Sequence, residues 1–159
     1  MSREIYKRPL EEYYLYRIGT GTTDNLITLE AVDSVLITEG IDDALTSATN
    51  IGFSFHFDGT DHTQYIASSN GFISLGGSLA TGSYYLNNLN TAKGVGTFLA
   101  PWWDDINTRL GGQVFTTLIG SAPARQRIIQ WSCNSYRAGQ DASNKIFMDF
   151  AIVLYETSN

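Results

Sequence analysis

The residues best suited to chemistry lie in one run, Trp102-Trp103-Asp104-Asp105. Aromatic faces can bind the apolar surfaces of sugars, and paired carboxylates supply the hard oxygen ligands that Ca²⁺ prefers. The run therefore admits a glycan or Ca²⁺ site. It equally suits a structural corner, in which one Trp fills the core and an Asp side chain accepts backbone N–H bonds in a turn. Adjacent strand residues point to opposite faces, so we expect one Trp in the core and the other exposed as a candidate partner contact.

A second candidate contact lies in the polar segment Gly76–Gly94, which contains Tyr84 and Tyr85. Its composition predicts a surface loop, and long loops in compact domains are often functional. We therefore group Tyr84 and Tyr85 with the Trp-Asp run as possible partner or glycan contacts.

The sequence motifs of metal sites and of common enzyme active sites do not match this chain. His56 and His62 flank the turn Asp58-Gly59, but two His and the distant Cys133 do not make a zinc pattern. The sequence has no EF-hand loop, no P-loop, no G-x-S-x-G and no G-x-G-x-x-G beside a helix. Any chain with 16 acidic residues can supply a glycosidase-like carboxylate pair. We expect a non-enzyme with no catalytic residue, bound metal or cofactor, and a buried, inert Cys133 thiol.

Charge and hydropathy argue against nucleic-acid binding, a membrane span and a secretory signal. A length of 159 residues suits one domain. The net charge of −6 and the scattered positions of the ten basic residues argue against nucleic-acid binding. No apolar stretch is long enough for a membrane span. The first residues lack the apolar region of a secretory signal. The protein is therefore expected either to work in a cytoplasm or to leave the cell another way, such as inside a virus particle released by lysis. The third alternative is an exported protein whose signal has been removed.

The elements that must position these residues are predicted to be strands, because long helical periodicity is absent. In Ile51–Phe57 large apolar residues alternate with small or polar ones, which predicts a half-buried strand. Asp58-Gly59 and Asn70-Gly71 predict hairpin turns. Thr38–Ala48 could form a short turn or helix. The other predicted strands are Val32–Thr38, Gln64–Ala67, Phe72–Leu75, Gln113–Ile119, Gln126–Cys133 and Ile146–Tyr155.

This strand count predicts an all-β fold, an antiparallel β-sandwich of the jelly-roll or immunoglobulin-like class. We assign residues 33–159 to the sandwich. Its predicted core is Ile51, Phe53, Phe55, Phe57, Phe72, Val114, Ile128, Trp131, Phe150, Ile152 and Leu154.

Residues 1–32 are predicted to form an attachment segment. Glu12–Ile18 and Leu26–Ala31 have strand composition and are joined by a Gly- and Thr-rich stretch, which indicates a hairpin or an extended arm. Tyr13, Tyr14 and Tyr16 are candidate assembly contacts, which could extend a neighbour's sheet or fill a groove. A chain truncated near Val32 is expected to fold but not to assemble.

Several short segments, in order from Val35 to Glu156, resemble the nidogen-like β-sandwich modules of bacterial surface and secreted proteins. They are Asn50–Phe55, Ser68–Ile73, Leu99–Asp105, Gly120–Arg125, Gln130-Trp131 and Leu154–Glu156. The resemblance implies a sandwich with an interaction or scaffold role and no established catalysis. It also implies that the Trp-Trp-Asp-Asp run marks a corner connecting the sheets, which favours the structural interpretation.

The sequence departs from that family in two ways. Members are usually exported, whereas this chain shows no signal, and members usually have one more strand after the Leu-Tyr-Glu segment, whereas this sequence stops at Asn159. We therefore expect that the sandwich lacks its final strand. The open edge of the strand Ile146–Tyr155 would then be covered by a continuation of the natural chain or by another chain.

Two hypotheses of function follow. The first is a non-enzymatic virion structural protein, such as a bacteriophage tail-fibre base, collar or tail component or head decoration. It would be assembled in the host cytoplasm as a homo-oligomer and act as an attachment or scaffold module. The second is an extracellular or cell-surface adhesion module that binds a glycan or a protein. An accessory domain of a glycan hydrolase is a weaker third hypothesis.

Overall fold

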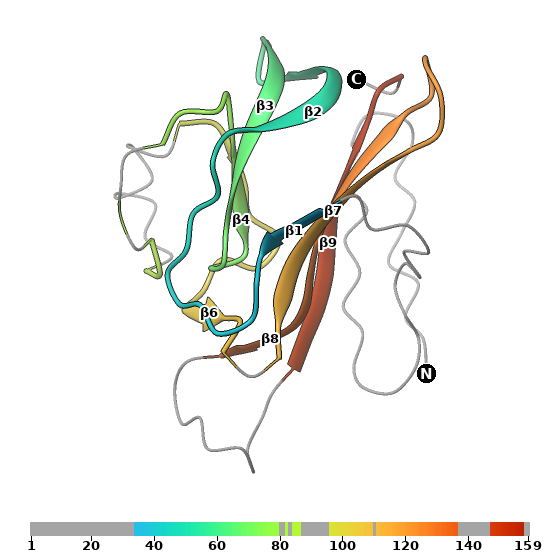
Figure 1. The fold of residues 1–159 in the computed structure, drawn as a ribbon. Helices are drawn as coiled ribbons and strands as arrows, with labels where there is room; N and C mark the ends of the chain where they lie inside the picture. Colours follow the sequence, from blue (N-terminus) through green and yellow to red (C-terminus); the bar gives the residue numbers. More distant parts are fainter. Residues whose placement is uncertain are drawn as a thin grey trace, which may run out of the picture.

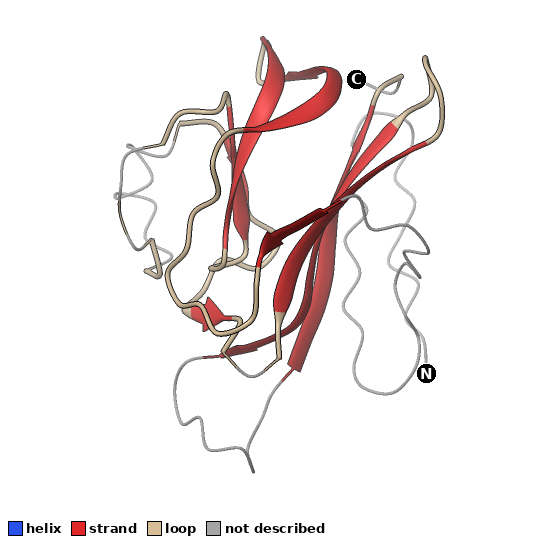
Figure 2. Ribbon diagram, in the orientation of Figure 1, coloured by secondary structure: helices blue, strands red, loops and turns tan. Residues whose placement is uncertain are grey.

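The computed structural model describes residues 34–79, 82, 84–86, 96–109, 111–136 and 147–157. These residues form strands and connecting turns, and no helix occurs among them (Figure 2). The strands are β1 (Ser34–Ile37), β2 (Thr49–Phe57), β3 (Thr60–Ser68), β4 (Phe72–Leu75), β5 (Phe98–Leu99), β6 (Ile106–Asn107), β7 (Gln113–Ile119), β8 (Gln126–Tyr136) and β9 (Phe147–Tyr155).

The strands form two antiparallel sheets that pack face to face (Figure 1). The five-stranded sheet has the order β1-β7-β8-β6, and β9 pairs with the other side of β8. The four-stranded sheet has the order β2-β3-β4-β5. The predicted all-β sandwich is therefore confirmed.

Two short turns set the register of the four-stranded sheet. Asp58 and Gly59 have φ angles of 51° and 72°, as the tight turn between β2 and β3 requires at both central positions. Gly71, with a φ of 81°, turns β3 into β4. Both hairpins predicted from the Asp-Gly and Asn-Gly pairs are confirmed.

The core lies between the sheets. Trp131 of β8 stacks on Phe150 of β9 with ring centroids 5.0 Å apart, and β2 contributes Ile51, Phe53 and Phe55 from the facing sheet. Phe57 is only partly buried, at the edge of this core.

Two predicted core residues belong to other clusters. Phe72 precedes the core residue Ile73, and Ile128 precedes the core residue Ile129, so each points to the outer face of its own sheet. Both are nevertheless buried, Phe72 against Trp103 and Ile128 beside Val153.

Sequence patterns missed the short strands. β5 and β6 have two residues each, too few to show a period, and β8 runs three residues beyond the predicted end at Cys133.

The segment 38–48 forms turns and bends and contains no helix. The arm over residues 1–32, its two predicted strands and the Cys133 side chain lie outside what the structure describes. Within the described ranges, no helix has the length and apolarity to cross a membrane.

Candidate functional site

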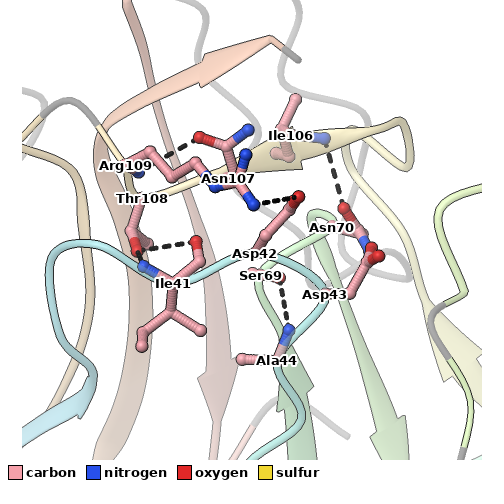
Figure 3. Close-up of polar contacts among 10 residues, drawn as sticks. All are labelled: Ile41, Asp42, Asp43, Ala44, Ser69, Asn70, Ile106, Asn107, Thr108 and Arg109. Carbon is pink, nitrogen blue, oxygen red and sulfur yellow. Dashed lines mark hydrogen bonds and ion pairs between the residues drawn. The ribbon is translucent and has the colours of Figure 1, made fainter.

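The candidate site is a polar corner where three segments meet around Asn70, in the turn between β3 and β4 (Figure 3). Asn70 is fully buried. Its Nδ2 donates to Oδ1 of Asp43 at 2.9 Å, and its Oδ1 accepts from the backbone N–H of Ile106 at 3.2 Å. Its carbonyl accepts from the N–H of Asp104 at 3.3 Å. One amide side chain thus joins the loop before β2 to the loop around β6.

The same two loops are joined a second time through Thr108. Its hydroxyl oxygen accepts from the N–H of Ile41 at 2.9 Å and donates to the carbonyl of Thr38 at 2.8 Å. Arg109 adds an ion pair to Asp42, with Nη2 3.1 Å from Oδ2. Because the Arg109 side chain is half exposed, that pair stabilises the corner by about 1 kcal/mol or less.

Three carboxylates gather in this corner: Asp42, Asp43 and Asp105 offer oxygens within 4.8 Å of one another. Such oxygens can ligate a hard cation, but Ca²⁺ takes six to eight of them. Asp42 already binds Arg109, and Asp43 already accepts from Asn70. The described contacts therefore define a hydrogen-bonded polar corner that supplies only part of a cation's ligand set.

Asp105 thus lies within the acidic group, whereas Asp104 has a turn contact in which its Oδ1 accepts from the N–H of Asp105 at 2.8 Å. The sequence gives no sign that Asp42 and Asp43 lie near Asp105. About sixty residues separate them in the sequence, and the contacts of Asn70, Thr108 and Arg109 bring the loops together.

The turn at Asn70-Gly71 packs directly on the Trp-Trp-Asp-Asp segment. A Cβ atom on Gly71 would lie 1.8 Å from the carbonyl oxygen of Trp102, so no larger residue fits without moving the backbone. The glycine is needed for this close approach as well as for its positive φ.

The two tryptophans point in different directions, and both are packed. Trp102 is partly buried against the main core and stacks on Phe150 with centroids 6.4 Å apart. Trp103 is 9% exposed and lies 5.3 Å from the ring of Phe72 on the outer side of the four-stranded sheet. Its Nε1 donates to the carbonyl of Tyr84 at 2.6 Å.

Trp103 therefore anchors Tyr84, in the segment after β4. Tyr84 is partly buried and makes an edge contact with Phe72 at 6.1 Å, and Tyr85 is also partly buried. Leu86 is 58% exposed. Of the predicted contact residues in the loop, the structure places Tyr84 in the aromatic cluster and Tyr85 beside the exposed Leu86.

A second polar cluster joins the sheets where β8 begins and β9 ends. Nε of Arg125 donates to Oε2 of Glu156 at 2.8 Å, and Nη1 donates to the carbonyl of Gly52 at 2.6 Å. The hydrogen bonds from Arg125 lower the pKa of Glu156, and those same bonds raise the pKa of Arg125. The buried Arg127 donates to the carbonyl of Ile51 at 2.9 Å. These contacts tie β2 of one sheet to β8 of the other.

The histidines do not come together. His56 is exposed and lies 2.7 Å from Asp61, with Nδ1 facing Oδ1, whereas His62 is buried on β3. In the ranges that the structure covers, the three aspartates are the only acid, His or Cys group with metal-like spacing.

Two packed antiparallel sheets tied by buried polar corners define an antiparallel β-sandwich module. A family model described as NIDO related matches residues 15–159, and the chain belongs to this nidogen-related family. The resemblance drawn from the short sequence segments is therefore confirmed, and the match begins about twenty residues earlier than those segments. Comparisons with curated proteins and with solved structures gave no match.

Proposed function

We propose that this protein is a non-enzymatic attachment or scaffold module. The observation that carries the proposal is the nidogen-related match over residues 15–159, since such a module points to extracellular or adhesive work. The contacts that the distinctive polar residues make also support the proposal. Asn70, Thr108 and Arg125 each bind other parts of the same chain, as residues that shape a scaffold do.

The particular role that we propose is structural, in a bacteriophage virion at a fibre base, collar, tail or head surface. Support comes from the first residues, which combine the basic cluster Arg3, Lys7 and Arg8 with Tyr13 and Tyr14. Arginine and tyrosine side chains are enriched where proteins dock on one another. The segment would attach the sandwich to its own copies or to another particle protein.

The proposed assembly role can be tested with the purified full-length chain and a chain that begins at Leu15. Light scattering coupled to gel filtration should find an oligomer for the full chain and a monomer for the shorter one. Two monomers that also fail to bind purified particles would contradict an assembly role for residues 1–14.

An adhesion module at the cell surface is the second candidate function, and the exposure of Leu86 favours it. This side chain is 58% exposed beside the partly buried Tyr85, and Trp103 donates a hydrogen bond to the carbonyl of the preceding Tyr84. A glycan array tests this candidate. Saturable binding that Leu86→Ser or Tyr85→Ala weakens tenfold, with an unchanged unfolding midpoint, would favour adhesion, and an empty array would favour the virion role.

A further inference from the structure

β2 lies at one end of the four-stranded sheet and has a bulge in its middle. In its pairing with β3, Asn50 lies opposite Gln64 and Phe55 lies opposite His62, so residues 51–54 of β2 face the single residue 63 of β3. Gly52 has a φ of 98°, a conformation that residues with a side chain rarely adopt. We call residues 51–54 the β2 bulge. Because extra residues of this kind lack regular ladder partners, other groups have to bind their backbone.

Two arginines at the start of β8 bind the backbone of the β2 bulge from the opposite sheet. Nη1 of Arg125 donates to the carbonyl of Gly52 at 2.6 Å, and Nε of Arg127 donates to the carbonyl of Ile51 at 2.9 Å. The guanidinium of Arg125 also lies over the ring of Phe53, with Cζ 5.7 Å from the ring centroid. The bulge is therefore held by side chains of the five-stranded sheet.

Glu156, the residue after β9, holds Arg125 in this position. Nε of Arg125 donates to Oε2 at 2.8 Å, and Nη2 donates to Oε1. A forked pair of this kind fixes the orientation of the guanidinium plane. The N–H of Glu156 also donates to the carbonyl of Arg125 at 2.9 Å. Because Nε and Nη2 are bound to Glu156, the remaining nitrogen Nη1 is directed at Gly52.

The β2 bulge carries part of the core. Ile51 is fully buried, Phe53 is 7% exposed, and both belong to the main core cluster. A Cβ atom on Gly52 would lie 2.9 Å from a methyl carbon of Leu118 on β7, so the bulge rests directly on the five-stranded sheet. A movement of the bulge away from that sheet would therefore uncover apolar side chains.

We propose that Arg125 and Glu156 form an acid-released latch, which keeps the β2 bulge closed on the five-stranded sheet. Once Glu156 is protonated, it has no charge and one of its oxygens becomes a donor, so the fork cannot form on both oxygens. Arg125 then loses the contact that directs Nη1 at Gly52. The bulge opens locally, while the ladders within the two sheets stay formed.

The latch is closed at neutral pH and opens in acid. The hydrogen bonds from Arg125 lower the pKa of Glu156, which therefore stays ionised in the folded protein at pH values where an unfolded Glu, with a pKa of about 4.3, takes up a proton. The stabilising contribution of the pair is present above the unfolded pKa and is lost as the pH falls through the lower folded pKa.

The elements packed around the pair offer few other charged groups. β7 and the turn at residues 120–124 contain no titratable side chain. The near ends of β8 and β9 carry Arg127 and Tyr155, and the carboxylate of Asp149 lies toward the other end of β9. β2 carries His56, which lies against Asp61. The acid response of the latch is therefore assigned to its single carboxylate.

Replacing Glu156 tests the latch at neutral pH. Glu156→Gln keeps the size of the side chain and removes its charge, as protonation does. In the full chain at pH 6, the nuclear Overhauser contact between Gly52 and the Leu118 methyl groups should be lost in this variant, whereas the ladder contact between Val114 and Trp131 should remain. A Gly52–Leu118 contact that survives in Glu156→Gln would overturn the proposal.

Acid titration of the unaltered full chain is the second test, and it decides the question if Glu156→Gln does not fold. Between pH 6 and pH 3 the Gly52–Leu118 contact should be lost before the ladder contact. Loss of both contacts together, as in global unfolding, would overturn the proposal. Glu39→Gln, at an exposed site, is the control and should follow the unaltered chain. The latch does not depend on the proposed attachment role, so failure of that role would leave it unchanged.

Discussion

At the residue scale, the distinctive positions act through contacts that a short-range pattern cannot reveal. Asn70-Gly71 is readable as a turn signal, and the structure confirms that turn. The sequence does not indicate that Asn70 also binds Asp43 and Ile106, or that Gly71 touches the backbone of Trp102. These partners come from distant segments, and only the folded chain brings them together.

Replacing Gly71 tests the close approach to Trp102. Gly71→Ala should destabilise the protein by more than about 4 kcal/mol, because the new methyl group would overlap a backbone carbonyl. Gly59→Ala is the matched control, since Gly59 also has a positive φ but has no atom within 4 Å of the added Cβ. It should cost about 1–2 kcal/mol. Urea denaturation measures both, and equal losses would mean that the Trp102 contact is unimportant.

The Arg125–Glu156 pair predicts a pH dependence of stability. Hydrogen bonds from Arg125 lower the pKa of Glu156 in the folded protein. The pair therefore stabilises the fold above the unfolded pKa of Glu, about 4.3, and this contribution is lost as the pH falls through the lower folded pKa. Glu156→Gln should reduce the difference in urea midpoint between pH 6 and pH 3, whereas Glu39→Gln, at an exposed site, serves as the control. An unchanged difference in Glu156→Gln would refute the contribution.

At the element scale, prediction succeeded for several strands but not for every long one, since β3 begins four residues before its predicted start at Gln64. β4 and β7 have the predicted bounds, and β2 and β9 differ from theirs by two residues or fewer. β5 and β6 were not predicted, because a strand of two residues is too short to show alternation. Alternation also identified buried positions without showing which layer buries them, which is why Phe72 and Ile128 were placed in the wrong cluster.

Two phenylalanines on β2 test the alternation quantitatively. Phe55→Ala should cost about 3–5 kcal/mol, because Phe55 is 1% exposed and its removal leaves a cavity between the sheets. Phe57 lies on the same face at the edge of the core, where water can fill the space that is left. Phe57→Ala should therefore cost clearly less. Similar losses for both in chemical denaturation would contradict the assigned depth of the core.

At the scale of the whole molecule, the segments that revealed the family meet in two places. Asn70 contacts the Trp-Trp-Asp-Asp segment, and Trp131 donates to the carbonyl of Ser68 at 2.8 Å. Arg125 contacts Glu156 and Gly52. The family pattern thus marks the joints between the sheets, so it predicted the fold well. The candidate carboxylate group also needs Asp42 and Asp43, which lie outside that pattern, so it could not be predicted.

The edge of β9 that faces away from β8 is a feature of the whole molecule. Within the described residues β9 pairs with β8 alone, and its sequence carries neither Pro nor Lys, the residues that commonly protect an edge strand. The expectation that another strand covers this edge stays a prediction. Hydrogen exchange of the β9 amides in the assembled and isolated protein measures it. Equal protection in both states would show that assembly does not cover the edge.

The most direct measurement of the central claim is the location of the protein in its natural setting. Gold-labelled antibodies against residues 34–157 should mark purified phage particles at a fixed position, as a virion attachment or scaffold module requires. Label on the cell envelope instead would support the adhesion role of the same module. Label confined to the cytosol, with neither particles nor envelope marked, would contradict the account.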